Sequence, residues 1–124
     1  MNEHRDIDFR EFARQVARVV EYNDGEIIFR EGDPPDVMYF VLKGSVEITS
    51  HGKHIETIEE GHALGIVSLI DNHPRVTRAK ALGDTELAVM DRRKFRYMVE
   101  EVPNFVWYVM LHLVHRLRSL NAAL

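Results

Sequence analysis

The chain contains no cysteine among its 124 residues. Disulfide bonds, thiolate nucleophiles and thiolate metal sites are therefore excluded, and nothing indicates an oxidising compartment. Long apolar runs are absent as well: no stretch approaches the ~18 residues of a membrane span. The charged start, residues 1–6, lacks the apolar core of a signal peptide. We therefore expect a cytoplasmic protein with no membrane partner.

A strong charge of either sign is also missing. The net charge is -4, and the basic residues are interspersed with acidic ones, which gives no continuous positive surface for a phosphate backbone. The densest basic stretch is Arg92-Arg93-Lys94 with Arg96, and two glutamates follow it on the same expected helix. This pattern is more typical of a solvated helix face than of a nucleic-acid patch. We therefore expect no nucleic-acid partner.

The signatures of catalysis are absent from the sequence. It has no Gly-x-Ser-x-Gly elbow, no P-loop and no dinucleotide-binding fingerprint. We therefore expect a protein that is not an enzyme, with no catalytic residues and no resident cofactor. A composition of 45% apolar and 29% charged residues is that of an ordinary globular chain, and the length fits one domain, residues 1–124.

Residues 25–47 contain two apolar runs that have the character of strands. Ile27–Phe29 is β-branched and aromatic, and it ends before a proline pair that cannot continue a strand because proline donates no N–H. Residues 37–42 are apolar at every position, which indicates a strand covered on both faces. Lys43-Gly44-Ser45 then predicts a tight hairpin, and the alternation up to Thr49 predicts a strand with one wet face.

The remaining pattern predicts more strands in the middle of the chain and helices at both ends. Apolar residues at helical spacing predict an amphipathic helix over residues 8–21, capped by Asp8. Two further helices are expected over residues 92–101 and from Pro103 to about Asn121. Further strands are expected over residues 53–58, 77–82 and 85–90, with turns at His51-Gly52 and Gly83-Asp84. The predicted fold class is mainly β with flanking helices.

The spacing of Gly25, Gly32 and Gly44, with Asp33 and Tyr39 between them, resembles the first half of the cyclic nucleotide-binding domain. That family occurs in catabolite-activator-type regulators, kinase regulatory subunits and certain ion channels. The resemblance covers nearly the whole chain. It implies a jelly roll, or double-stranded β-helix, with one N-terminal and two C-terminal helices, acting as a non-catalytic regulatory module. In the bacterial regulators a helix-turn-helix domain follows, and we expect no DNA-binding domain within residues 1–124.

Residues 64–77 resemble the phosphate-binding cassette of this family. In the cassette, a short helix after a glycine points N–H groups at the cyclic phosphate, an arginine pairs with its oxygens, and a glutamate accepts the ribose 2′-hydroxyl proton. Gly65, Ser68 and the Pro74-Arg75 pair match the pattern, whereas Ile66 stands in place of the glutamate. The resemblance thus implies a small anionic ligand, cyclic AMP or cyclic GMP, bound weakly. The candidate ligand-binding residues are Gly65, Ile66, Val67, Ser68, Pro74, Arg75, Val76 and Thr77.

Three alternatives remain open from the residues alone. Arg75 can instead be a surface arginine paired with an acid such as Asp71. The domain can be degenerate, binding no nucleotide and serving dimerisation or the docking of a protein partner. Finally, a jelly roll is also the cupin scaffold, and His51, His54 and His62 lie close in sequence. The cupin motif is absent, however, and a strand would place His51 and His54 on opposite faces, so we expect no metal site.

The last expected helix carries an unusually wide apolar surface. Its apolar side chains between Phe105 and Leu120 sweep about 200° of the helical wheel, twice the stripe that a surface helix needs. One packing partner cannot cover such an arc. The bacterial regulators of the family dimerise through this helix, so we expect a homodimer through residues 104–121.

Overall fold

The computed structural model describes residues 9–123, with side chains described up to residue 119. Its contacts divide this part of the chain into two compact units, residues 9–92 and residues 93–123. The expectation of one domain spanning residues 1–124, without a DNA-binding domain, stays a prediction. The cap expected at Asp8 and the side chain of Leu120 lie outside the described residues.

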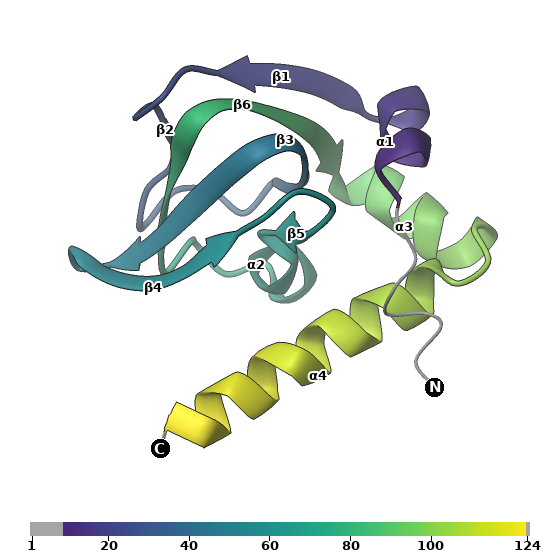
Figure 1. The fold of residues 1–124 in the computed structure, drawn as a ribbon. Helices are drawn as coiled ribbons and strands as arrows, with labels where there is room; N and C mark the ends of the chain where they lie inside the picture. Colours follow the sequence, from purple (N-terminus) through teal and green to yellow (C-terminus); the bar gives the residue numbers. More distant parts are fainter. Residues whose placement is uncertain (1–8, 124) are drawn as a thin grey trace. The chain divides into compact units, whose positions relative to one another are not determined.

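The unit of residues 9–92 is built on one six-stranded sheet. Two 14-residue strands, β3 (Val37–Ser50) and β6 (Arg78–Asp91), pair antiparallel and form its centre (Figure 1). The strands β1 and β2 pair with β6, and β4 and β5 pair with β3. These shorter strands are β1 (Arg18–Tyr22), β2 (Ile27–Phe29), β4 (Lys53–Ile58) and β5 (Ala63–Leu64). The prediction of a mainly β fold is confirmed.

Residues 38–42, in the first half of β3, are buried at every position, as expected for a strand covered on both faces. In the second half of β3, alternate residues point into the core. Val46 and Ile48 are buried, and across the ladder they face the buried Ala81 and Ala79 of β6. Fully burying an aliphatic side chain of this size stabilises the fold by about 1.5–3 kcal/mol. The residues between them, including Glu47, lie on the outer face, as the predicted wet face of this strand requires.

Two turns that the sequence predicted are bulges inside long strands. Lys43-Gly44-Ser45 does not form a hairpin: β3 runs through it, and its register with β6 shifts on both sides of Lys43. Gly44 has φ 84°, and a Cβ there would lie 2.6 Å from the carbonyl oxygen of Asp84, so only glycine fits. The two strands predicted around Gly83 are likewise one strand, β6. In both cases a glycine bends the strand instead of reversing the chain.

The helix predicted over residues 8–21 is wrong in its second half. The helix α1 covers only Arg10–Val16, and the chain then forms strand β1. Val19 and Val20 pair with Ala88 and Leu87 of β6, and this pairing overrides the helical spacing of the apolar residues. The hairpin predicted at His51-Gly52 is confirmed, since Ser50 and Lys53 are register partners of β3 and β4.

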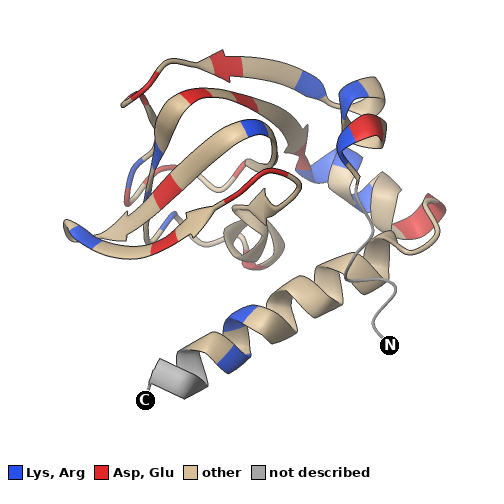
Figure 2. Cartoon of the chain, in the orientation of Figure 1, with Lys and Arg blue, Asp and Glu red and all other residues tan. Residues whose placement is uncertain are grey.

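The unit of residues 93–123 consists of helix α3 (Arg92–Glu101), which begins at the unit boundary, and helix α4 (Phe105–Ala123). Both predicted C-terminal helices are confirmed, although α4 begins two residues after Pro103. Phe95 and Phe105 meet edge to face, with ring centroids 5.7 Å apart. Figure 2 shows that α4 carries no charged residue before Arg116. None of the helices within residues 9–123 has the length and hydropathy needed to span a membrane.

Candidate functional site

A six-residue helix, α2 (Ile66–Asp71), begins directly after Gly65, as the resemblance to the cassette implied. Gly65 adopts φ 83°, a left-handed conformation that a glycine reaches without strain. At the other end, Asn72 also has a positive φ, and its N–H donates to the carbonyl oxygen of Ser68 at 2.9 Å. The two ends of α2 are therefore defined by the two residue types that best tolerate this region of backbone space.

The C-terminal end of α2 is held by an arginine from the densest basic stretch. Arg92 donates to the carbonyl oxygens of Leu69 at 2.9 Å and of Pro35 at 3.1 Å. It also donates to Oδ1 of Asn72 at 3.1 Å. The sequence had indicated a solvated helix face for this stretch. Arg92 differs from that expectation, because its guanidinium donates hydrogen bonds to backbone carbonyls.

Arg75 is buried, with only 4% of its surface exposed. Its Nη1 donates to the carbonyl oxygen of Gly65 at 3.0 Å, and its Nη2 donates to the carbonyl oxygen of Val37. The guanidinium carbon lies 4.5 Å from the centre of the Phe29 ring, a cation–π geometry. The backbone of Arg75 is fixed as well, because its N–H donates to Asp33 O at 2.9 Å and its carbonyl accepts from Gly32 N–H at 2.8 Å.

The charge of Arg75 has no carboxylate partner within residues 9–123. Asp71, the ion-pair partner considered from the sequence, instead accepts from the N–H of His73 at 3.1 Å, so that alternative is wrong. The Nε of Arg75 is buried and has no hydrogen-bond partner among the described residues. Burial lowers the pKa of the guanidinium from its ordinary value, against smaller opposing effects of Tyr39, Asp36 and Asp33. A buried cation with a free donor is costly unless an anion approaches it.

The other candidate residues divide into a buried and an exposed group. Ile66 is only 1% exposed and packs into the interior. Its hydrocarbon side chain offers no hydrogen-bond acceptor to a ligand. Val76 is 72% exposed, and Val67 is also exposed, which leaves apolar side chains on the surface beside the site. Ser68 and Thr77 are half-buried and Pro74 is exposed. The structure thus brings Gly65 and Arg75 into direct contact, and it separates Ile66 from the surface.

Two partners of Arg75 had no signal in the sequence. Phe29 and Val37 lie 46 and 38 positions before Arg75, and they reach it only because β2 and β3 fold over the same region. For Asp33, whose carbonyl oxygen accepts from the N–H of Arg75, the only signal in the sequence was its place in the family pattern. No group of three His, Asp or Glu side chains within the described part of the chain is placed to hold a metal ion. The cupin-like alternative therefore gains no support.

Comparison with known proteins shows which family the chain is similar to. A family model described as the cyclic nucleotide-binding domain matches residues 19–102. A cAMP-dependent protein kinase regulatory subunit of Debaryomyces hansenii is 32% identical over 98 residues, which are 77% of this chain and 22% of the kinase subunit. In seven curated relatives that it matches, this chain spans between 7% and 26% of the relative's own length.

Solved structures with the same fold include regulators and parts of enzymes. The catabolite activator protein of Thermus thermophilus has a TM-score of 0.82 and 25% identity, over 91% of this chain and 55% of that protein. The EAL enzyme Bd1971, in a half-site-occupied form, has a TM-score of 0.66 and 33% identity, over 85% of this chain and 98% of that one. These likenesses confirm the jelly-roll fold that the sequence predicted.

Proposed function

Since the chain belongs to the cyclic nucleotide-binding domain family, we propose that it is a non-catalytic regulatory module that binds a small anionic ligand, a cyclic nucleotide, and binds it weakly. The observation that carries this proposal is the buried guanidinium of Arg75, which has, among the residues that the structure describes, no partner for its Nε and no carboxylate near enough for an ion pair. A phosphate oxygen satisfies both the free donor and the uncompensated charge.

Two features of the site support weak binding. The first is competition, because Nη1 and Nη2 of Arg75 already donate to the carbonyl oxygens of Gly65 and Val37. A phosphate that takes the whole guanidinium fork must break these two hydrogen bonds, although it offers a charged acceptor in place of neutral ones. A phosphate that takes only Nε gains a single hydrogen bond. In either geometry part of the gain is offset.

The second feature is the absence of an acceptor for the sugar. The family resemblance places the ribose-binding glutamate at position 66, and the buried isoleucine there accepts nothing. Losing the acceptor of a charge-assisted hydrogen bond costs about 1.5–3 kcal/mol, which corresponds to one to two decades of affinity. We therefore expect binding roughly 10 to 100 times weaker than that of a site with the glutamate.

Calorimetric titration of the purified protein with cyclic AMP and cyclic GMP tests this proposal. Adenosine, which has the base and the ribose but no phosphate, is the matched control. We expect saturable, weak binding of a cyclic nucleotide and none of adenosine. Equal binding of adenosine would overturn the anion site, and tight binding of cyclic AMP would overturn the role given to Ile66. No binding by any of the three would favour the degenerate domain.

A specific observation favours a dimer as part of this function. Five large apolar side chains that recur at helical spacing along α4 are exposed: Val106, Trp107, Met110, Val114 and Leu117. Exposed apolar side chains gathered on one element mark an interaction site. We propose that a second copy of the chain covers them, as the family resemblance implies for the bacterial regulators.

A further inference from the structure

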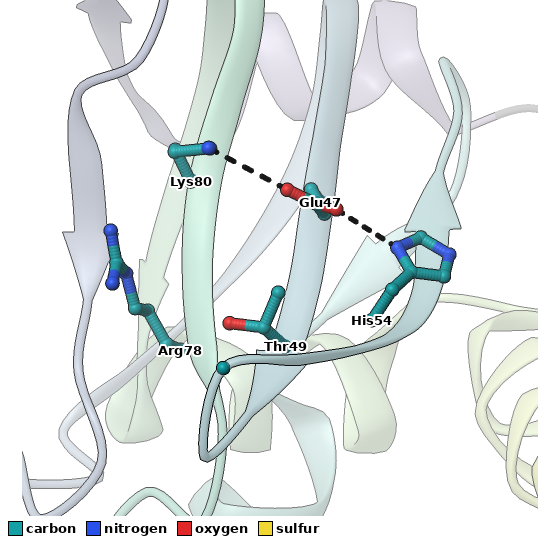
Figure 3. Close-up of a pocket in the computed structure, with 6 residues that line it drawn as sticks. Glu47, Thr49, His54, Arg78 and Lys80 are labelled. Atoms are coloured by element: carbon teal, nitrogen blue, oxygen red, sulfur yellow. Dashed lines mark hydrogen bonds and ion pairs between the residues drawn. The ribbon is translucent and has the colours of Figure 1, made fainter.

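We infer that a second anion site, independent of Arg75, lies on the outer face of the sheet, and that it takes a compact oxyanion of the phosphate class. A groove of about 230 Å³ is found there. It crosses β3, β4 and β6 and is lined by Glu47, Thr49, Gly52, His54, Arg78 and Lys80 (Figure 3). None of the cassette residues of positions 65–77 contributes to it.

The pairing of the strands places the polar groups of this groove in two adjacent rows. Thr49 on β3 is the register partner of both Arg78 on β6 and His54 on β4. Glu47, two residues before Thr49 and on the same face, is the register partner of Lys80. Directly paired residues hold their Cβ atoms about 4.5–5.5 Å apart. The guanidinium, the ammonium and the hydroxyl therefore come from neighbouring positions of a rigid sheet.

The charges in the groove do not balance. Glu47 is the one carboxylate among the described residues that line it, and it is shared between Nδ1 of His54 at 3.0 Å and Nζ of Lys80 at 3.7 Å (Figure 3). These two contacts lower the pKa of Glu47, the contact with His54 contributing most, so the carboxylate stays ionised. Arg78 remains a second permanent cation. It faces a more distant carboxylate, Glu31, without a hydrogen bond to it among the described residues.

Two donors in the groove are unused. Neither the guanidinium of Arg78 nor the hydroxyl of Thr49 donates a hydrogen bond within residues 9–119. The long, half-exposed pair between Lys80 and Glu47 is of the kind that contributes little to stability, so Lys80 is readily redirected. A tetrahedral oxyanion presents several acceptor oxygens and can take donors from Arg78, Lys80 and Thr49 together. The lining residues in the described part of the chain include no Phe, Tyr or Trp on which a base could stack, which argues against a nucleotide base here.

The test is titration with inorganic phosphate and with glycerol 3-phosphate, followed by amide NMR shifts at constant ionic strength in a buffer without phosphate. We expect saturable shifts in residues 47–54 and 78–80. Arg78→Gln should weaken binding about tenfold or more, since it removes a charge-assisted bidentate donor. Glu47→Gln should tighten binding severalfold, because it frees Lys80 and removes the competing carboxylate. An effect of opposite sign at the two positions is not expected of a purely structural ion-pair cluster.

Arg18→Gln is the matched control, because Arg18 is an exposed arginine on β1, outside the groove. It changes the net charge as Arg78→Gln does and should leave the affinity unchanged. Saturable binding of either phosphate compound supports the site, and the tighter of the two identifies the free or the esterified form as its ligand. Shifts that rise linearly, that map to residues 65–76, or that weaken equally in Arg18→Gln would overturn the inference.

Discussion

The Cβ atom that Gly65 lacks would lie 2.8 Å from Nη1 of Arg75 and 3.3 Å from its Cζ. The guanidinium of Arg75 therefore packs directly on the peptide of a residue ten positions earlier, and it does so only because that residue is glycine. The two best-matched residues of the cassette are one physical unit, in which the glycine makes room for the arginine and its carbonyl oxygen accepts from it.

Gly65→Ala should displace the Arg75 side chain and abolish ligand binding. Gly32→Ala is the matched control, because Gly32 has a similar φ of 87° but no atom within 4 Å of the added Cβ. Both changes incur about 1–2 kcal/mol of backbone strain. Gly65→Ala should cost about 1 kcal/mol more, since a hydrogen bond of Arg75 is lost. Urea denaturation and calorimetry measure the two effects. Equal stability of the two variants with binding retained in both would contradict this account.

Arg75→Met should abolish the binding of cyclic nucleotides without a large loss of stability. Methionine fills much of the same volume as arginine. The change removes a buried charge that has no ion-pair partner among the described residues, which is favourable, and it also removes two hydrogen bonds to carbonyl oxygens, which is unfavourable. The desolvation cost of the cation and the lost hydrogen bonds offset each other, so we expect a change within about 1 kcal/mol. A variant that unfolds at much lower urea concentration than wild type would show that Arg75 is mainly structural.

Ile66→Glu should restore the missing acceptor and tighten cyclic nucleotide binding by about one to two decades. The same change places a carboxylate at a position that is 1% exposed, so the free protein should become less stable. Ile66→Gln is the control, because it adds a polar group of similar size without the charge. Calorimetry on the three proteins decides the matter. No gain in Ile66→Glu would mean that the competition at Arg75, and not the sugar contact, limits affinity.

The sequence predicted the local elements of the site well, because they depend on neighbouring residues. The resemblance of Gly65 to the glycine of the cassette implied where α2 begins, and His51-Gly52 predicted the hairpin between β3 and β4. The errors came where distant strands decide the conformation. Val19 and Val20 fit a helical stripe, yet β6 pairs with them. Gly44 has the sequence character of a turn residue, yet the close approach of Asp84 makes it a bulge.

The environment of Arg75 shows the same limit within the site itself. Its presence in the cassette was readable from the sequence, but its orientation was not. That orientation depends on the carbonyl of Val37 and the ring of Phe29, which come from strands far along the chain. The groove around Glu47 was invisible for the same reason, since the pairing of β3 with β4 and β6 brings its residues together.

Replacing both Trp107 and Leu111 with glutamate should convert a dimer into monomers. Trp107 is 48% exposed on α4, and a carboxylate there cannot be buried against a second copy without a large desolvation cost. Ile55→Glu is the control, because Ile55 is similarly exposed, at 49%, but lies on β4. Sedimentation at tens of micromolar separates the cases. A wild-type monomer at that concentration would show that the exposed residues of α4 have another role.

Tyr39→Phe should make the protein less sensitive to alkali. Burial raises the pKa of Tyr39 above its ordinary value of 10.0. The folded state therefore favours the neutral phenol, and this contribution to stability is complete below about pH 10 and is lost as the pH rises toward the folded pKa. Phenylalanine cannot ionise, so the variant should lose less stability above pH 10. Tyr97→Phe, at an exposed position, is the control, and an equal effect of both changes would refute the role of Tyr39.

The pairing of β3 with β6 determines when the fold can form as the chain is synthesised. Partner residues lie between 29 and 54 positions apart along the chain, from the Thr49–Arg78 pair to the Val37–Asp91 pair. Such distant contacts must close long loops before they contribute any stability, which favours folding in milliseconds to seconds over microseconds. At a translation rate of ~5–20 residues per second, the apolar residues of β3 wait roughly 2–11 s for their partners on β6. The nascent chain thus presents an unpaired hydrophobic strand for seconds, and a chaperone that shields residues 37–42 during that interval would protect its yield.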